Sequence, residues 1–229
     1  GGMLAAMDRR RVLHDLESRG IEHLFYMQVD NPLVKVCDPA FLGYHLHAGS
    51  ELSTLVARKE APRDKVGNVV SIGGRLQIIE YSDLNPLPDE IVLKTTADGQ
   101  PVFWAGNTAV HIISVDFLRR MAASDTALPF HLAHKKVPHV SQSGDWVEPD
   151  QPNAIKFERF IFDLLPEARH AMVVEIEAVK EFQPVKNASG EAKDTPESVR
   201  TAIQSLHRQW LAEAGVQLVT GDTKVVDRG

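Results

Sequence analysis

Apolar and polar residues alternate along the first quarter of the chain in patterns that predict helices and strands in turn. Between residues 3 and 19, leucines and methionines recur near helical spacing with charged residues between them, and Gly20 follows, as is typical of an amphipathic helix. Residues 24–29 form a nearly continuous apolar run, which predicts a short strand buried on both faces of a parallel sheet. Residues 39–48 predict a second helix and residues 52–57 a second strand, the alternation of an α/β layer protein.

The pattern changes after Gly67. Two short strand-like runs, 69–72 and 76–81, flank the pair Gly73-Gly74 and predict an inserted antiparallel β-hairpin. The proline-rich segment 83–89 predicts an exposed loop. With this hairpin, the predicted fold is α/β with a mixed sheet.

The second half of the chain returns to alternating elements. A strand over 108–113 leads into a helix capped by Ser114, and residues 155–165 predict another helix. Residues 171–179 predict a strand, and a last helix begins at Thr195-Pro196, an N-cap followed by proline in the first turn.

Composition narrows the class of protein. The 229 residues carry 25 Lys and Arg against 31 Asp and Glu, a formal net charge of −6, and no long basic block, so a nucleic-acid partner is not expected. The single cysteine, Cys37, excludes an internal disulfide. No apolar run approaches the roughly 18 residues of a membrane span. We therefore expect a cytoplasmic protein with no membrane contact.

Two acidic residues stand where predicted strands end. Asp30 follows the apolar run at 24–29, and the carboxyl ends of parallel strands are where α/β proteins bind ligands, so it suits metal or phosphate chemistry. Asp30 could equally cap the turn before Pro32. Glu80 ends the second strand of the predicted hairpin and could bind a ligand or be simply solvated.

Four further residues could contact a ligand. Asn107 follows a glycine at the start of a strand, where its amide could bind a sugar hydroxyl or shape a turn. Phe160 and Phe162 are two apart in the predicted helix and point in different directions, so one could face a pocket, although most such aromatics are core. Lys186 lies in a loop after a strand, where it could neutralise phosphate or be an ordinary surface lysine.

Three histidines form a weaker candidate. His131, His134 and His139 lie close together in sequence, but no carboxylate follows at a recognised offset and Pro138 interrupts the segment. We expect surface structure rather than a zinc site.

Several motifs occur together in a characteristic order. They are Val29-Asp30-Asn31-Pro32, Ile79-Glu80-Tyr81-Ser82-Asp83, Ala105-Gly106-Asn107-Thr108, Lys135-Lys136-Val137-Pro138, Pro152-Asn153-Ala154-Ile155-Lys156, Phe160-Ile161-Phe162-Asp163 and Pro184-Val185-Lys186-Asn187. On these motifs the chain resembles the C-terminal part of UDP-N-acetylhexosamine pyrophosphorylases, within the wider uridylyltransferase family.

The resemblance implies the C-terminal portion of a GT-A-like, Rossmann-type nucleotidyltransferase domain. In such enzymes a sugar 1-phosphate attacks the α-phosphorus of UTP and pyrophosphate leaves. The implied product is UDP-N-acetylglucosamine. The alternatives are a UTP–glucose-1-phosphate uridylyltransferase, a broad UDP-sugar pyrophosphorylase, or a non-catalytic module that binds sugar nucleotides.

The same resemblance implies a role for each matching residue. Asp30 would hold Mg²⁺ and act in catalysis with Lys186, which contacts phosphate. The residues that would bind substrate are Gly67, Glu80 and Asn107 at the sugar, Phe160 and Phe162 at the N-acetyl group, and Gly1 and Gly2 at the uridine.

The chain also departs from the family pattern. The glycine-rich nucleotide loop, with its Gly-Thr-Arg-Leu core and following lysine, does not occur in the sequence. We therefore expect a fragment whose partner is the absent N-terminal half, with residues 1–190 forming the sugar- and metal-binding part and residues 191–229 a packing helix and tail. The sequence leaves the oligomeric state open.

Overall fold

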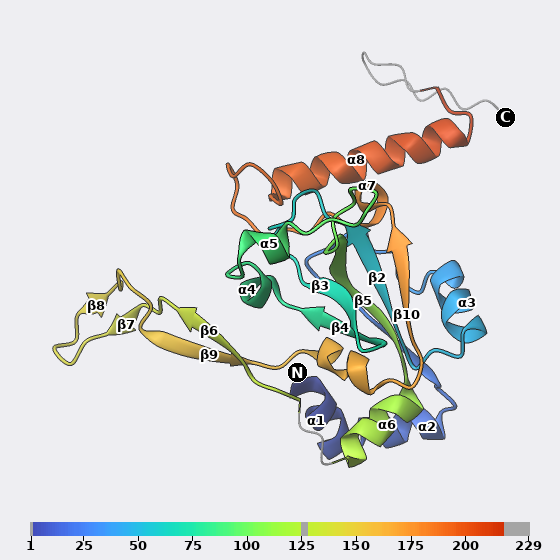
Figure 1. The fold of residues 1–229 in the computed structure, drawn as a ribbon, viewed down its shortest axis with the longest axis horizontal. Helices are drawn as coiled ribbons and strands as arrows, with labels where there is room; N and C mark the ends of the chain where they lie inside the picture. Colours follow the sequence, from blue (N-terminus) through green and yellow to red (C-terminus); the bar gives the residue numbers. More distant parts are fainter. Residues whose placement is uncertain (1, 125–127, 218–229) are drawn as a thin grey trace.

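A mixed six-stranded sheet forms the centre of the computed structural model, which describes residues 2–124 and 128–217 (Figure 1). In order across the sheet, the strands are β10 (Ala171–Ile176), β2 (Leu52–Arg58), β5 (Ala105–Ser114), β3 (Asn68–Ile72) and β4 (Arg75–Ile79), with β1 (His23–Tyr26) paired to β5. Only β10 and β2 run parallel among these pairs. The predicted α/β class with a mixed sheet is confirmed.

The strand predicted at 24–29 differs from the expectation. β1 covers only His23–Tyr26, pairs antiparallel with the second half of β5, and is half-exposed along its length. Asp30 therefore lies in a turn beyond an antiparallel strand, not at the carboxyl end of a buried parallel one. The apolar run at 24–29 does not distinguish the two cases, because a short half-exposed strand can have the same composition as a fully buried one.

The strands β3 and β4 pair antiparallel around Gly73 and Gly74, whose φ angles of 58° and 79° suit a tight turn that residues other than glycine rarely adopt. β3 also pairs with β5 at Asn68 and Gly106. The two strands therefore extend the edge of the main sheet. The segment 83–89, predicted to be an exposed loop, overlaps two short helices, α4 (Tyr81–Leu84) and α5 (Asp89–Val92). Only residues 85–88 connect them, and Leu84 is buried.

Helices cover the two ends of the sheet. The single helix predicted at 3–19 is two helices, α1 (Gly2–Arg9) and α2 (Val12–Ser18), because Arg11 adopts a left-handed φ of 58°. Both pack with α6 (Val115–Ala123), which Ser114 caps as predicted. At the opposite end of the molecule lies α8 (Pro196–Glu213), whose N-cap Thr195 accepts a hydrogen bond from the Ser198 amide (Figure 1). The remaining helices are α3 (Pro39–His47) and α7 (Ala178–Glu181).

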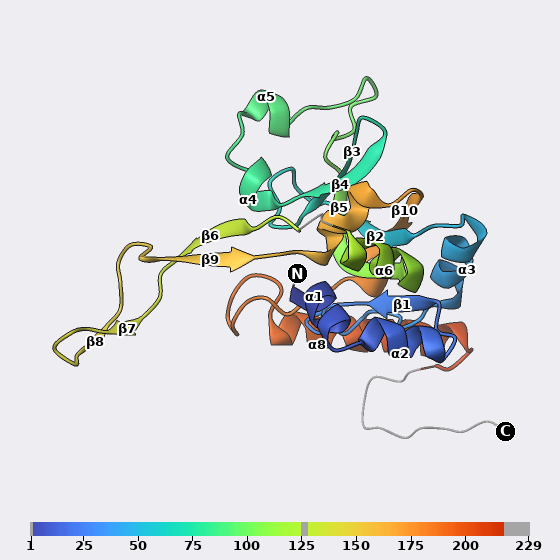
Figure 2. The same ribbon diagram turned by 90° about the horizontal axis from the view of Figure 1, so that it is seen from below.

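An arm of two strands extends away from the body in both views (Figures 1 and 2). It is formed by β6 (His131–Lys135) and β9 (Ala154–Glu158), with β7 (His139–Val140) and β8 (Trp146–Val147) at its tip. The helix predicted at 155–165 is therefore wrong. Its first residues pair with β6, and only Ile161–Glu167 coils, as a 3₁₀ helix (η1), because strand pairing overrides local helix propensity.

Three apolar clusters fill the core. The largest joins α1, α2 and α6 to η1 and includes Phe117, Leu118 and Leu164, all with no exposed surface. In the part of the chain that the structure describes, no helix is long and apolar enough to cross a membrane.

Two histidines lie inside this framework. His111 in β5 is fully buried, and neither of its ring nitrogens has a hydrogen-bond partner among the described residues. Burial lowers its pKa to about 3. His45 bonds Ser53 and His23, and burial together with the charge of His23 lowers its pKa to about 4.

We expect these two histidines to make the fold acid-sensitive. Both prefer the neutral form when folded but titrate near 6.5 when unfolded, so the unfolded state binds more protons below pH 6.5. Each should cost about 2 kcal/mol of stability on going from pH 7 to pH 5. Urea unfolding at the two pH values measures this loss, and His111→Phe should reduce it by about 2 kcal/mol. The exposed control His47→Gln should leave the loss unchanged; an equal loss in His111→Phe would contradict the assignment.

Candidate functional site

Three of the predicted sugar-binding residues converge where β3, β4 and β5 meet. Gly67 is buried just before β3, and its carbonyl accepts a hydrogen bond of 2.7 Å from the Asn107 amide in β5. A Cβ atom on Gly67 would lie 3.0 Å from Glu80 Oε1 and 3.7 Å from the Asn107 Cβ. The structure thus brings Gly67, Glu80 and Asn107 into direct contact, although 40 residues separate the first from the last.

An irregularity in β5 sets the position of Asn107. The register against β2 shifts between Thr54 and Val56, and Ala109 adopts a φ of 57°, which is uncommon for a residue with a side chain. The Asn107 Oδ1 accepts from the Ala109 amide at 3.0 Å and from Thr54 Oγ1 at 3.4 Å. Nδ2 of Asn107 has no partner among the residues described, so it remains a donor for a ligand.

Glu80 carries a half-buried carboxylate. It follows β4 directly and begins α4, but its side chain makes no capping hydrogen bond. Burial raises its pKa, and the carboxylates of Asp83 and Asp163 act in the same direction, whereas His131 and Lys186 lower it. A partly desolvated carboxylate whose ionised form is favoured by a nearby lysine and histidine is well suited to accept hydrogen bonds from a polar ligand.

Phe160 and Phe162 form one aromatic surface. Their rings stack with centroids 4.8 Å apart and planes at 11°, so the expectation that they point in different directions is wrong. Phe160 precedes η1 and Phe162 lies in its first turn, where the backbone is not α-helical. Phe162 is buried in the cluster with Val56 and Ile78, and Phe160 packs against that cluster from outside.

Two residues to which the sequence analysis gave no role in ligand binding, His131 and Asp163, adjoin the aromatic pair. His131, set aside above as surface structure, bonds Asp163 through Nε2 and Oδ2 at 2.9 Å, and its ring lies 4.8 Å from the Phe160 ring. The signal available in the sequence was Asp163 itself, an acidic residue directly after an aromatic pair. His131 is in a strand, and within the described chain no three His, Cys, Asp or Glu side chains gather as a metal site.

Asp30 and Lys186 are brought together by the backbone. The Val185 amide donates to the Asp30 carbonyl at 2.8 Å, so Lys186 is one residue from the bonded pair. Asn31 stabilises the contact between these two segments, because its side chain donates to the Glu181 carbonyl at 2.8 Å and accepts from the Gln183 amide at 3.0 Å. Lys186 also acts electrostatically on Glu80. The predicted phosphate and sugar residues therefore belong to one region.

Of the two predicted uridine residues, the structure describes only Gly2. Gly2 is the exposed first residue of α1, and Gly1 falls outside the described residues.

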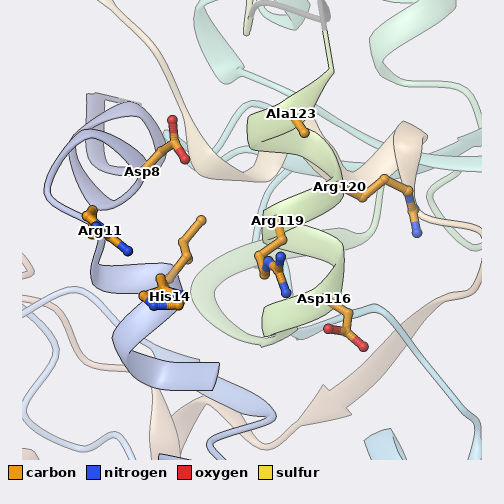
Figure 3. Close-up of a pocket in the computed structure, with 8 residues that line it drawn as sticks. Asp8, Arg11, His14, Asp116, Arg119, Arg120 and Ala123 are labelled. Carbon is orange, nitrogen blue, oxygen red and sulfur yellow. The ribbon is translucent and has the colours of Figure 1, made fainter. Parts of the chain in front are cut away.

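A separate cavity does not coincide with this region. It has a volume of about 640 Å³ and lies between α1, α2 and α6, lined by Asp8, Arg11, His14 and Arg119 among others (Figure 3). Arg119 is ion-paired with Glu17, and Arg120 bonds both carboxylate oxygens of Glu51. Because these charges are already neutralised within the chain, the cavity is a weaker candidate for a substrate site than the region around Glu80.

The fold is similar to that of solved UDP-sugar pyrophosphorylase structures. The crystal structure of an Entamoeba histolytica protein assigned as UDP-N-acetylglucosamine pyrophosphorylase is 31% identical, with a TM-score of 0.83 over 93% of this chain and 52% of that one. A UDP-N-acetylglucosamine pyrophosphorylase from Trypanosoma brucei is 25% identical, with a TM-score of 0.70 over 89% of this chain and 39% of that one.

The family profile described as UTP--glucose-1-phosphate uridylyltransferase matches residues 1–220, and the chain belongs to this family. A Xenopus tropicalis UDP-N-acetylhexosamine pyrophosphorylase-like protein 1 is 38% identical over 220 residues, and the UDP-N-acetylglucosamine pyrophosphorylase of Saccharomyces cerevisiae is 34% identical over 225. The matches cover 96% of this chain but 42% and 46% of those relatives, so the chain spans less than half of their length. The resemblance found in the motifs is confirmed.

We expect the space at Gly67 to be essential for the site. Gly67→Val would place methyl groups against the Glu80 carboxylate and against Ile78 Cγ2, which lies 3.0 Å from an added Cβ, so unfolding stability should fall by about 1–3 kcal/mol. Denaturant unfolding measures this change. Gly43→Ala in α3 is the matched control, because an added Cβ meets nothing within 4 Å and should stabilise the helix slightly. Equal effects of the two changes would contradict the close approach.

Proposed function

We propose that this chain is the sugar- and metal-binding part of a uridylyltransferase that forms UDP-N-acetylglucosamine and pyrophosphate from UTP and N-acetylglucosamine 1-phosphate. The observation that carries the proposal is the contact of Gly67, Glu80 and Asn107 beside the stacked Phe160–Phe162 pair. The family membership supports a nucleotidyl-transfer reaction.

The polar residues would fix the sugar ring. The Glu80 carboxylate accepts hydrogen bonds from sugar hydroxyls, and Asn107 Nδ2 donates to a ring or hydroxyl oxygen. Because Glu80 is half-buried, a sugar with a hydroxyl in the wrong orientation leaves a desolvated acceptor unpaired. Gly67 allows the carboxylate to approach the backbone, so the sugar can lie close to β3.

The aromatic pair, Phe160 and Phe162, would bind the N-acetyl group. Two stacked rings with one face outside the core offer an apolar surface for a methyl group and a flat surface for an amide plane. A sugar without the acetamido group would lose these contacts, so the proposal includes a preference for N-acetylglucosamine 1-phosphate.

The charged residues would hold the phosphates. In-line transfer of a nucleotidyl group requires mainly positioning and charge neutralisation, which the exposed Lys186 ammonium supplies at the phosphate. Asp30 is half-exposed and its carboxylate has no hydrogen-bond partner within residues 2–124 and 128–217. Mg²⁺ needs only one or two carboxylates beside substrate phosphates and water, so Asp30 fits as its holder. When bound, the ion neutralises phosphate charge.

The remaining parts of the proposal concern the whole protein. We propose a GT-A-like, Rossmann-type nucleotidyltransferase domain, with residues 1–190 as its sugar- and metal-binding part, 191–229 as a packing helix and tail, and Gly1-Gly2 in the uridine contact. An N-terminal half would supply the nucleotide loop, and the protein would act in the cytoplasm. The second candidate, a UTP–glucose-1-phosphate uridylyltransferase, is favoured by the description of the matching family.

Turnover by the complete product of the natural gene tests the reaction. With Mg²⁺ and UTP, pyrophosphate release should be faster with N-acetylglucosamine 1-phosphate than with glucose 1-phosphate when the two compete at equal concentration. Preference for glucose 1-phosphate would select the second candidate. Binding of UDP-sugars without pyrophosphate release would instead indicate a non-catalytic module.

Asp30→Asn tests the metal assignment in the same protein. The change keeps the side chain's shape but removes its charge, so Mg²⁺-dependent turnover should fall at least 100-fold, on the order of 3 kcal/mol of transition-state stabilisation. Asp150→Asn, at an exposed position between β8 and β9, is the control and should retain wild-type turnover. Unchanged turnover in Asp30→Asn would exclude Asp30 as the holder of the ion.

Glu80→Gln tests the sugar contact. Loss of a charged acceptor should raise the KM for the sugar 1-phosphate about 10- to 100-fold, as hydrogen bonds to charged groups contribute about 1.5–3 kcal/mol, with little change in the KM for UTP. Steady-state kinetics with each substrate varied in turn measures the split. An equal rise in both KM values would contradict a specific sugar contact.

A further inference from the structure

A histidine–carboxylate pair lies beside the proposed sugar site without belonging to it. His131 begins β6 at the base of the arm, and Asp163 lies in the first turn of η1. Their side chains meet at 2.9 Å between Nε2 and Oδ2, and they are 28% and 11% exposed, so the contact is partly shielded from water. Because an ionised carboxylate only accepts, the proton between them is on Nε2 of His131.

Both members of the pair contact Phe160. The His131 ring lies 4.8 Å from the Phe160 ring at an angle of 52°, on an aromatic surface that Phe162 continues at 4.8 Å. Asp163 Oδ2 accepts from the Phe160 amide at 3.4 Å, and the Asp163 amide donates to the Phe160 carbonyl at 3.3 Å. The backbone and the ring of Phe160 therefore both contact the same hydrogen-bonded His131–Asp163 pair.

The pair also contributes to the charge around Glu80. Four charged groups act on this carboxylate: His131 and Lys186 favour its ionised form, while Asp83 and Asp163 oppose it. Asp163 is bonded to His131, so the histidine pairs with one of the two carboxylates that oppose the charge on Glu80 and also favours that charge directly.

We propose that His131 and Asp163 are positioning residues that set sugar selectivity, holding the Phe160 ring against Phe162 and keeping Glu80 ready to accept hydrogen bonds. This inference rests on the proposed function, because its consequence is expressed in the recognition of the sugar 1-phosphate. The pair also connects the base of the β6–β9 arm to η1, so the arm and the sugar site share one polar contact.

His131→Gln and Asp163→Asn in the complete gene product test the proposal. Each should raise the KM for N-acetylglucosamine 1-phosphate about 10-fold, leave the KM for UTP within 2-fold, and lower the preference over glucose 1-phosphate by a similar factor. The double variant should cost no more than either single one, since both break the same contact. The acid limb of kcat/KM should move to higher pH in His131→Gln, because a group that favours ionised Glu80 is lost.

His134→Gln is the matched control. His134 is on the same strand but exposed, opposite Ile155, and it should behave as wild type in every measurement. Thermal unfolding of each variant distinguishes a positioning role from a general loss of stability. A loss of stability should lower the Tm, whereas a positioning role should change the KM for the sugar at an unchanged Tm.

The outcomes distinguish the two proposals. If the wild type releases pyrophosphate and His131→Gln and Asp163→Asn keep its sugar KM and preference, the positioning role is wrong and the proposed function stands. Equal rises in the KM for UTP and for the sugar, or additive losses in the double variant, would also overturn it. If the wild type turns over no sugar 1-phosphate, both the function and the positioning role fail.

Discussion

The close approach between β5 and the residue before β3 is the contact on which the site depends. The 2.7 Å hydrogen bond from the Asn107 amide to the Gly67 carbonyl brings two distant segments together. A glycine leaves room there, because Glu80 Oε1 and Ile78 Cγ2 each lie 3.0 Å from where a side chain would begin and would have to shift to admit one. Gly67 therefore lies against both the Glu80 carboxylate and Asn107, so that the two polar side chains border the same space.

A second backbone contact brings together Asp30 and Lys186, the two residues proposed to act at the metal ion and the phosphate. Asp30 and Lys186 come from opposite ends of the chain, and the bond between the Asp30 carbonyl and the Val185 amide places them side by side. Asn31 is 2% exposed, and its side chain forms hydrogen bonds with the backbone of Glu181 and Gln183 next to this contact. Because a buried amide without partners would be costly, this connection is a stable one.

Three histidines have different roles because their surroundings differ. His111 is buried without a hydrogen-bond partner among the described residues and His45 is buried with polar partners, so both are kept neutral and make the fold sensitive to acid. His131 is partly exposed and paired with a carboxylate next to an aromatic surface. The first two therefore affect the stability of the sheet, whereas the third acts on the residues of the proposed sugar site.

The sequence alone determined the α/β class, the pairing around Gly73-Gly74, the caps at Ser114 and Thr195, and the family, because these depend on local turn chemistry and on motifs in order. It misjudged residues 24–29 and 155–165, and it passed over His131. Only the tertiary structure decided these, since a short apolar run or a lone histidine takes its role from what packs against it. The contact of Gly67 with Glu80 and the stacking of Phe160 on Phe162 depend on how distant segments approach one another, which local periodicity does not encode.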